Sequence, residues 1–139
     1  MNKYIKGLSE KDKQVQLKQL ERSKRDYKLD IFTDRKDLSS FKEKPSSYVL
    51  KVKKITGLPV NFDKLADKLT RTQGRRKMVR KGFEEIYDKG RAAYYSSGSR
   101  PNQTPESWGK GRLASVLVGG PARKNDIDIV RKYDIPLLK

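Results

Sequence analysis

The segment that most constrains the fold of this chain is residues 94–120, YYSSGSRPNQTPESWGKGRLASVLVGG. Its first part is rich in serine, glycine and other residues that favour a loop. Its second part carries the signals of a helix start, because Thr104 is a typical N-cap and Pro105 fits the first helical position. Two glycines, Gly119 and Gly120, are typical of the point where such a helix stops. The segment therefore predicts a loop followed by one capped helix.

On this predicted helix, apolar side chains fall near one face, at the spacing of an α-helix. They are Trp108, Leu113, Val116 and Leu117. Arg112 lies among them, so we expect its guanidinium either to lie against the indole of Trp108 or to pair with an internal acid. An aromatic side chain at helical spacing beside a leucine is more often part of a core than a stacking platform for unpaired bases. We therefore expect Trp108 to fix a fold or an interface.

Two further segments show helical spacing of their apolar residues. One is residues 62–69, which Asn61 can cap, and the other is residues 75–90, which Gly90 would end. Together with the capped helix described above, they predict a small helical domain over residues 58–139. The fold class that we expect is mainly α.

The N-terminal part, residues 1–57, is more polar. Residues 10–26 can form a polar helix, and Ser46 or Ser47 can cap a short helix that ends at Gly57. Between these helices, single apolar residues stand in a polar background without a sustained period. We therefore expect a long, basic and partly extended arm, ordered largely by its partners.

The composition narrows the function. The chain has 139 residues, and its formal net charge of +17 favours an anionic partner: nucleic acid, a phospholipid surface or an acidic protein. It contains no cysteine and no histidine, so thiol nucleophiles, imidazole bases and nearly every zinc site are excluded. No nucleotide-binding glycine motif is present. We expect no enzymatic activity and no cofactor. We also expect no membrane-spanning segment, because no apolar run approaches the necessary length.

The strongest local charge feature is a basic run at the start of the predicted helix 75–90. It consists of Arg75, Arg76, Lys77, Arg80 and Lys81. Residues four apart share a helical face, so the run can form a stripe that contacts phosphates. Such runs are usually solvated helix faces, but the high net charge of this chain leaves both interpretations open at this point.

Residues 83–93 (FEEIYDKGRAA) and the segment that follows resemble a small, basic, functionally uncharacterised protein family. That family recurs in large nucleocytoplasmic double-stranded DNA viruses, including algal and amoebal viruses. The matching residues are Tyr87, Gly90, Ala93, Tyr94, Ser97, Gly98, Arg100, Pro101, Gln103, Trp108, Arg112, Ala114, Ser115, Gly119 and Gly120. The N-terminal patterns KYIKGLSEKDKQ, SKRDYK and SFKEKPSS are similar as well, whereas Gly111 stands where alanine is expected. The resemblance implies no activity, but it implies a protein made by, and packaged in, a large icosahedral virus.

From these observations we expect a virion structural protein, a minor capsid or cement-like component that links capsid subunits through its arm. Its partners would be capsid proteins or other virion proteins. It would lie on the inner side of the capsid shell, after a stay in the host cytoplasm during assembly. The candidate interface residues are Tyr4, Phe32, Phe41, Tyr48, Arg100, Trp108 and Arg112. The alternative is a nucleic-acid-binding protein without sequence preference, which is associated with the viral genome through the basic run.

Overall fold

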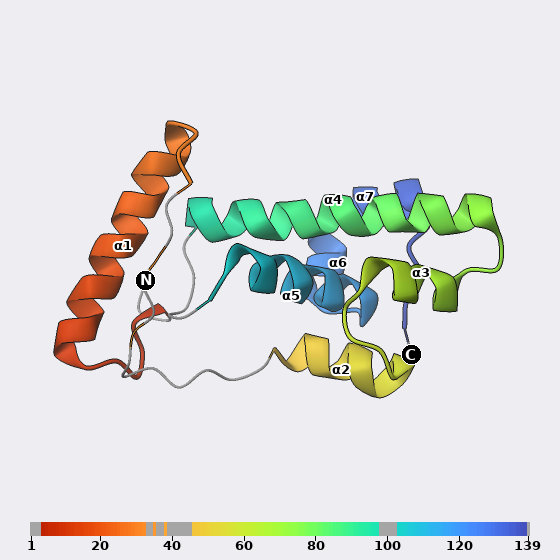
Figure 1. Cartoon of the computed structure of the whole chain (residues 1–139), viewed down its shortest axis with the longest axis horizontal. Helices are drawn as coiled ribbons and strands as arrows, with labels where there is room; N and C mark the ends of the chain where they lie inside the picture. Colours follow the sequence, from red (N-terminus) through yellow and green to blue (C-terminus); the bar gives the residue numbers. More distant parts are fainter. Residues whose placement is uncertain (1–3, 33–34, 36–37, 39–45, 98–102, 139) are drawn as a thin grey trace. The chain divides into compact units, whose positions relative to one another are not determined.

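The computed structural model of the chain describes residues 4–32, 35, 38, 46–97 and 103–138 (Figure 1). These residues form helices and no strand, which confirms the prediction of a mainly α protein. The chain packs into two compact units. Unit 1 comprises residues 1–44 and 91–108, and unit 2 comprises residues 45–90 and 109–139.

The main helix of unit 1 is α1 (Glu10–Lys28), which ends two residues beyond the predicted point. It begins where the Ser9 hydroxyl accepts a hydrogen bond from Asp12 N at 3.2 Å, an ordinary N-cap. Its fully buried positions are few: Gln16, Leu20 and Ser23. A helix with so narrow a buried face gains little stability from apolar packing. The extended arm that we expect in the N-terminal part, residues 1–57, stays a prediction.

Aromatic and aliphatic side chains from several segments complete the interior of unit 1. The buried ones are Tyr4, Leu8, Leu38, Tyr94 and Tyr95. Trp108 is half-buried, and its ring centroid lies 6.4 Å from that of Tyr94 in an edge-on arrangement. The ring of Tyr4 is tilted against that of Trp108, and the centroids of these two rings are also 6.4 Å apart. Trp108 therefore packs at the edge of this interior and keeps part of its surface exposed.

Unit 2 is built from the remaining helices. They are α2 (Ser47–Thr56), α3 (Phe62–Leu69), most of α4 (Gln73–Ser97), most of α5 (Pro105–Leu117), α6 (Pro121–Asn125) and α7 (Ile127–Tyr133). One apolar core joins them: Val52, Val60, Leu65, Ala66, Val79, Phe83, Ile86, Leu113, Ala114, Val116, Leu117, Ile129, Val130, Ile135 and Leu138. Because Val52 belongs to this core, α2 packs with the helices that follow it in the chain.

Some helix ends agree with the bounds predicted from the sequence, and others do not. The bounds of α3 match the predicted residues 62–69, and Asn61 caps it by accepting a hydrogen bond from Lys64 N at 3.0 Å. The predicted end of α4 at Gly90 is wrong, because the helix runs on to Ser97. Two alanines follow Gly90, and the next two tyrosines are buried, which outweighs the cost of about 1 kcal/mol for one helical glycine.

Both predicted ends of α5 are confirmed. At its start, Thr104 Oγ1 accepts a hydrogen bond from Ser107 N, and Ser107 Oγ accepts one from Thr104 N, each at 3.0 Å. At its end, Gly119 has φ 77° and Gly120 N donates to Ser115 O at 2.7 Å. These are the bonds of a helix closed by a left-handed glycine.

Candidate functional site

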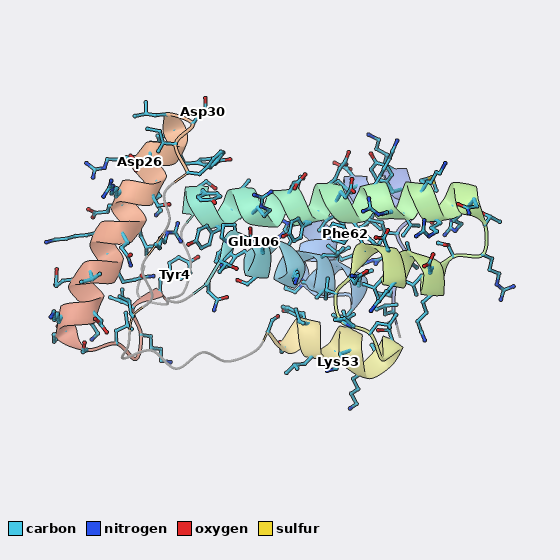
Figure 2. The ribbon with its side chains drawn as sticks, viewed as in Figure 1. Tyr4, Asp26, Asp30, Lys53, Phe62 and Glu106 are labelled. Carbon is cyan, nitrogen blue, oxygen red and sulfur yellow. The ribbon has the colours of Figure 1, made fainter. Side chains whose placement is uncertain are left out.

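The largest exposed apolar side chains among the described residues of unit 1 lie in the turn directly after α1. They are Leu29, Ile31 and Phe32, with 71%, 51% and 63% of their surface exposed. We call these three residues the apolar turn. Figure 2 shows Asp26 and Asp30, which bracket its beginning, at this end of α1. Three exposed side chains of this size within four residues make the turn the first candidate for an interaction site.

The backbone of the apolar turn is fixed by hydrogen bonds. Asp26 O accepts from Leu29 N at 2.9 Å and from Ile31 N at 2.8 Å, and Asp30 N donates to Tyr27 O at 3.1 Å. Asp30 takes the left-handed conformation, with φ 59°, that closes the helix. Aspartate tolerates this conformation better than most side chains do. An ordered backbone therefore presents apolar side chains to solvent.

Two tyrosines support the apolar turn from behind. The rings of Tyr27 and Tyr95 are stacked at 5.9 Å with an interplanar angle of 4°. The ring of Phe32 is tilted against both, at 5.0 Å from Tyr95 and 6.0 Å from Tyr27. Such aromatic pairs hold a ring in place beyond the effect of area burial alone. Phe32 is thus exposed on one side and anchored on the other.

Tyr94, the residue before Tyr95, contacts a half-buried cation, Arg35. The Arg35 guanidinium carbon sits 3.9 Å from the centroid of the Tyr94 ring. Its Nη2 donates to Ser23 Oγ at 2.9 Å and to Tyr94 O at 2.5 Å. Burial lowers the pKa of Arg35, and the neighbouring tyrosines partly offset this shift. The guanidinium ties α1 to the end of α4 within unit 1, at the residue before Tyr95.

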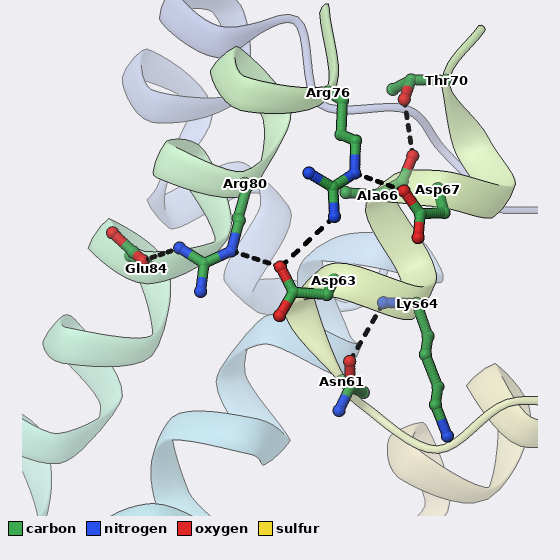
Figure 3. Close-up of polar contacts among 9 residues, drawn as sticks. All are labelled: Asn61, Asp63, Lys64, Ala66, Asp67, Thr70, Arg76, Arg80 and Glu84. Atoms are coloured by element: carbon green, nitrogen blue, oxygen red, sulfur yellow. Dashed lines mark hydrogen bonds and ion pairs between the residues drawn. The ribbon is translucent and has the colours of Figure 1, made fainter. Parts of the chain in front are cut away.

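The predicted anion-binding run lies in unit 2, and its arginines are already paired (Figure 3). Arg76 pairs with Asp67 and, at 3.6 Å, with Asp63. Arg80 bonds to Asp63 at 2.7 Å and to Glu84. The hydrogen bond to Asp63 is the main cause of a raised pKa for Arg80. These ion pairs bind α3 to α4 and reduce the charge that the arginines offer to a phosphate.

The other members of the run differ from each other. Arg75 pairs with Asp134 at 2.5 Å and also donates to its backbone oxygen, so it ties α4 to the end of α7. Lys77 and Lys81 are exposed and pair with no acid in the described part of the chain. Only these two lysines of the predicted run are therefore available for an external anion.

Arg112 has the second of its two expected roles, because it pairs with an internal acid. Its Nε and Nη2 donate to the two carboxylate oxygens of Asp126, each at 2.7 Å. The Asp126 side chain is fully buried, and Lys89 Nζ lies 3.5 Å from one of its oxygens. Burial alone would raise the pKa of Asp126, but the bonds from Arg112 and both positive charges hold it below its ordinary value. The pair joins α5 to the start of α7 and stabilises unit 2.

The predicted interface residues that the structure describes are divided between the two units: Tyr4, Phe32 and Trp108 belong to unit 1, and Tyr48 and Arg112 belong to unit 2. Tyr4 is buried beside Trp108, and Tyr48 packs against the core of unit 2. Phe41 and Arg100 lie outside the described residues. Of the set, Phe32 alone combines a described position with high exposure, and it is accompanied by Leu29 and Ile31, which the prediction left out. Three large apolar residues within four positions, directly after a charged helix, were the signal that could have found them.

The acids among the described residues do not gather in any group of three that could hold a metal ion. No helix in the described ranges is both long and apolar enough to cross a membrane.

A family model described as a family of unknown function (DUF5824) matches residues 1–133. No curated protein and no solved structure matches the chain.

Proposed function

The chain belongs to DUF5824, a family of unknown function, so we propose its role from the surfaces of the chain itself. In this proposal it is a structural protein of a large DNA-virus particle, a minor capsid or cement-like component that binds capsid proteins at the inner side of the shell. The resemblance of residues 83–120 to proteins of such viruses supports a place in the virus particle. The apolar turn supports the mode of binding.

The observation that carries the proposal is the exposure of the apolar turn. A monomeric protein gains nothing from keeping three large apolar side chains in water on an ordered backbone. Full burial of a side chain such as Leu29 or Phe32 contributes about 1.5–3 kcal/mol. An anchor of this size, fixed in place by Tyr27 and Tyr95, is typical of the energetic centre of a protein–protein interface.

The net charge of +17 has a different part in this proposal. Charges outside the centre of an interface chiefly speed encounter and orient the partners. A basic protein would therefore be steered toward acidic capsid surfaces before the apolar turn is buried. Positive steering and apolar anchoring together favour a protein partner at this site.

Photo-crosslinking in virus particles tests the proposal. A photo-crosslinking amino acid replaces Ile31, and in a control it replaces Lys18, which is exposed on α1. We expect adducts with capsid proteins from position 31 and none, or far fewer, from position 18. Absence of the protein from purified particles, or equal adducts from the two positions, would contradict the proposal.

The alternative function, nucleic-acid binding without sequence preference, keeps one observation in its favour. Lys77 and Lys81 lie four residues apart on α4, are exposed and have no acidic partner among the described residues. Two phosphate contacts give a shallow salt dependence, because each contact contributes about one unit to the slope of log affinity against log salt. A titration with duplex DNA distinguishes the functions: a slope near two that vanishes in the Lys77→Gln, Lys81→Gln variant would favour the alternative.

A further inference from the structure

A second exposed surface lies on α2, in unit 2, and is independent of the apolar turn. Leu50 and Ile55 are 52% and 41% exposed, and Lys51, Lys53 and Lys54 are exposed around them. We call these five residues the α2 face. Lys53, which is labelled in Figure 2, extends outward from the helix. The face combines positive charge with aliphatic side chains and contains neither an arginine nor an aromatic residue.

The orientation of α2 follows from its buried side. Val52 is fully buried and Thr56 nearly so, and Thr56 Oγ1 donates to Val52 O at 2.7 Å. Leu50 and Lys54 are also four residues apart, so they share a side of the helix, roughly opposite the buried pair. The core of unit 2 therefore holds one side of α2 and leaves the α2 face outside.

Acids in the described part of the chain do not neutralise the α2 face. The sequence contains no acid between residues 46 and 62, and the three lysines pair with none in the described part of the chain. The next acids, Asp63 and Asp67, are held by arginines of α4 (Figure 3). Figure 3 also shows Lys64 of α3 pointing away from those arginines. Charge on α3 is thus segregated, with the acids turned toward α4.

We propose that the α2 face binds the surface of a bilayer that contains anionic lipids. Lysines attract anionic headgroups, and their long stems let the ammonium groups stay at headgroup level while neighbouring apolar side chains enter the acyl boundary. Leu50, which shares its side of α2 with Lys54, supplies the central apolar side chain, and Ile55, five residues on, lies at the edge of the face. The contact is peripheral: the helix lies on the membrane and does not cross it.

The composition of the face argues against the two other polyanions. A nucleic-acid backbone would use the lysines but gives Leu50 and Ile55 no apolar partner. A protein interface is typically enriched in arginine and aromatic residues and depleted of lysine at its centre, the reverse of what α2 presents. A lipid surface uses both components of the α2 face.

Flotation of the full chain with vesicles tests this proposal. We expect binding to vesicles of phosphatidylcholine mixed with phosphatidylserine, no binding to phosphatidylcholine alone, and weaker binding as salt rises. The variant Lys51→Glu, Lys53→Glu, Lys54→Glu should lose about a hundredfold in affinity, since each surface lysine contributes about fivefold. Leu50→Ser, which leaves the charge unchanged, should lose about tenfold.

A matched control separates the α2 face from the net charge. The variant Lys6→Glu, Lys11→Glu, Lys18→Glu makes the same charge change at exposed positions of unit 1 and should bind vesicles nearly as the wild type does. Equal losses in the two triple variants would overturn the proposal. So would failure of the wild type to bind the anionic vesicles. If Leu50→Ser leaves vesicle binding unchanged while duplex DNA competes for the lysines, the surface binds phosphate backbones instead. Helical circular dichroism of every variant confirms that it is folded.

Discussion

Among single residues, Asp126 carries a fully buried charge in unit 2 and is bonded twice by Arg112. The substitution Asp126→Asn leaves the guanidinium facing a neutral amide. We expect the free energy of unfolding to fall by about 3 kcal/mol, as when one partner of a buried pair is removed. Urea denaturation measures the change. Asp128→Asn is the control, since that carboxylate is exposed on α7 and should cost less than about 1 kcal/mol.

The same carboxylate predicts a pH dependence. The pKa of Asp126 is below its ordinary value of 3.8: burial raises it, but the bonds and charges of Arg112 and Lys89 lower it further. Its stabilising contribution is therefore complete above the unfolded-state pKa and is lost as the pH falls through the folded-state pKa. Between about pH 5 and about pH 3, the wild type should lose more unfolding free energy than Asp126→Asn does. Parallel pH profiles of the two proteins would refute this assignment.

At the scale of elements, the contact of α5 with α4 depends on one glycine and not on another. A Cβ atom at Gly109 would lie 2.6 Å from Cδ2 of Tyr87, whereas one at Gly111 would meet only Ser46 Oγ, at 4.0 Å. Gly109→Ala should therefore cost about 1–3 kcal/mol through overpacking. Gly111→Ala, which restores the alanine expected from the viral resemblance, should gain about 0.5–1 kcal/mol. Thermal denaturation of the two variants should show shifts of opposite sign.

Elements whose ends are set by local chemistry could be predicted from the sequence. Asn61 and Thr104 carry their own capping groups, so α3 and the start of α5 followed directly. The extension of α4 beyond Gly90 could not, because it depends on burial of side chains against segments distant in the chain. The turn that ends α1 could not be predicted either, because Asp30 occupies the left-handed position at which a glycine usually marks the end of a helix.

The pairing of the arginines could be predicted only in part, for the same physical reason. The sequence offered a cation at Arg112 and predicted either an indole or an internal acid as its neighbour, but Asp126 as the partner emerges only from packing. Likewise, the sequence left open whether Arg76 and Arg80 contact an anion, because only folding brings α3 and its acids beside them. Net charge is a property of the sequence, whereas available charge is a property of the fold.

At the scale of the whole molecule, the division of the chain can be tested with fragments. All buried core residues of unit 2 lie between Val52 and Leu138, so a fragment of residues 46–139 contains them all. A fragment of residues 58–139, the domain expected from the sequence, lacks α2. We expect 46–139 to unfold cooperatively, and 58–139 to be less stable by at least about 2 kcal/mol, because it loses the burial of Val52 and part of that of Tyr48. Urea denaturation followed by circular dichroism measures both; equal stability would favour the shorter domain.

The packing of Trp108 has a practical consequence for any such experiment. It is the only tryptophan of the chain, and its indole lies beside Tyr4 and Tyr94 within unit 1. Intrinsic emission excited at the indole alone is therefore a local reporter of unit 1, whereas the helical signal sums over both units. Comparing the two melting curves reveals whether the units lose their structure together or one after the other, and the protein needs no attached dye to show it.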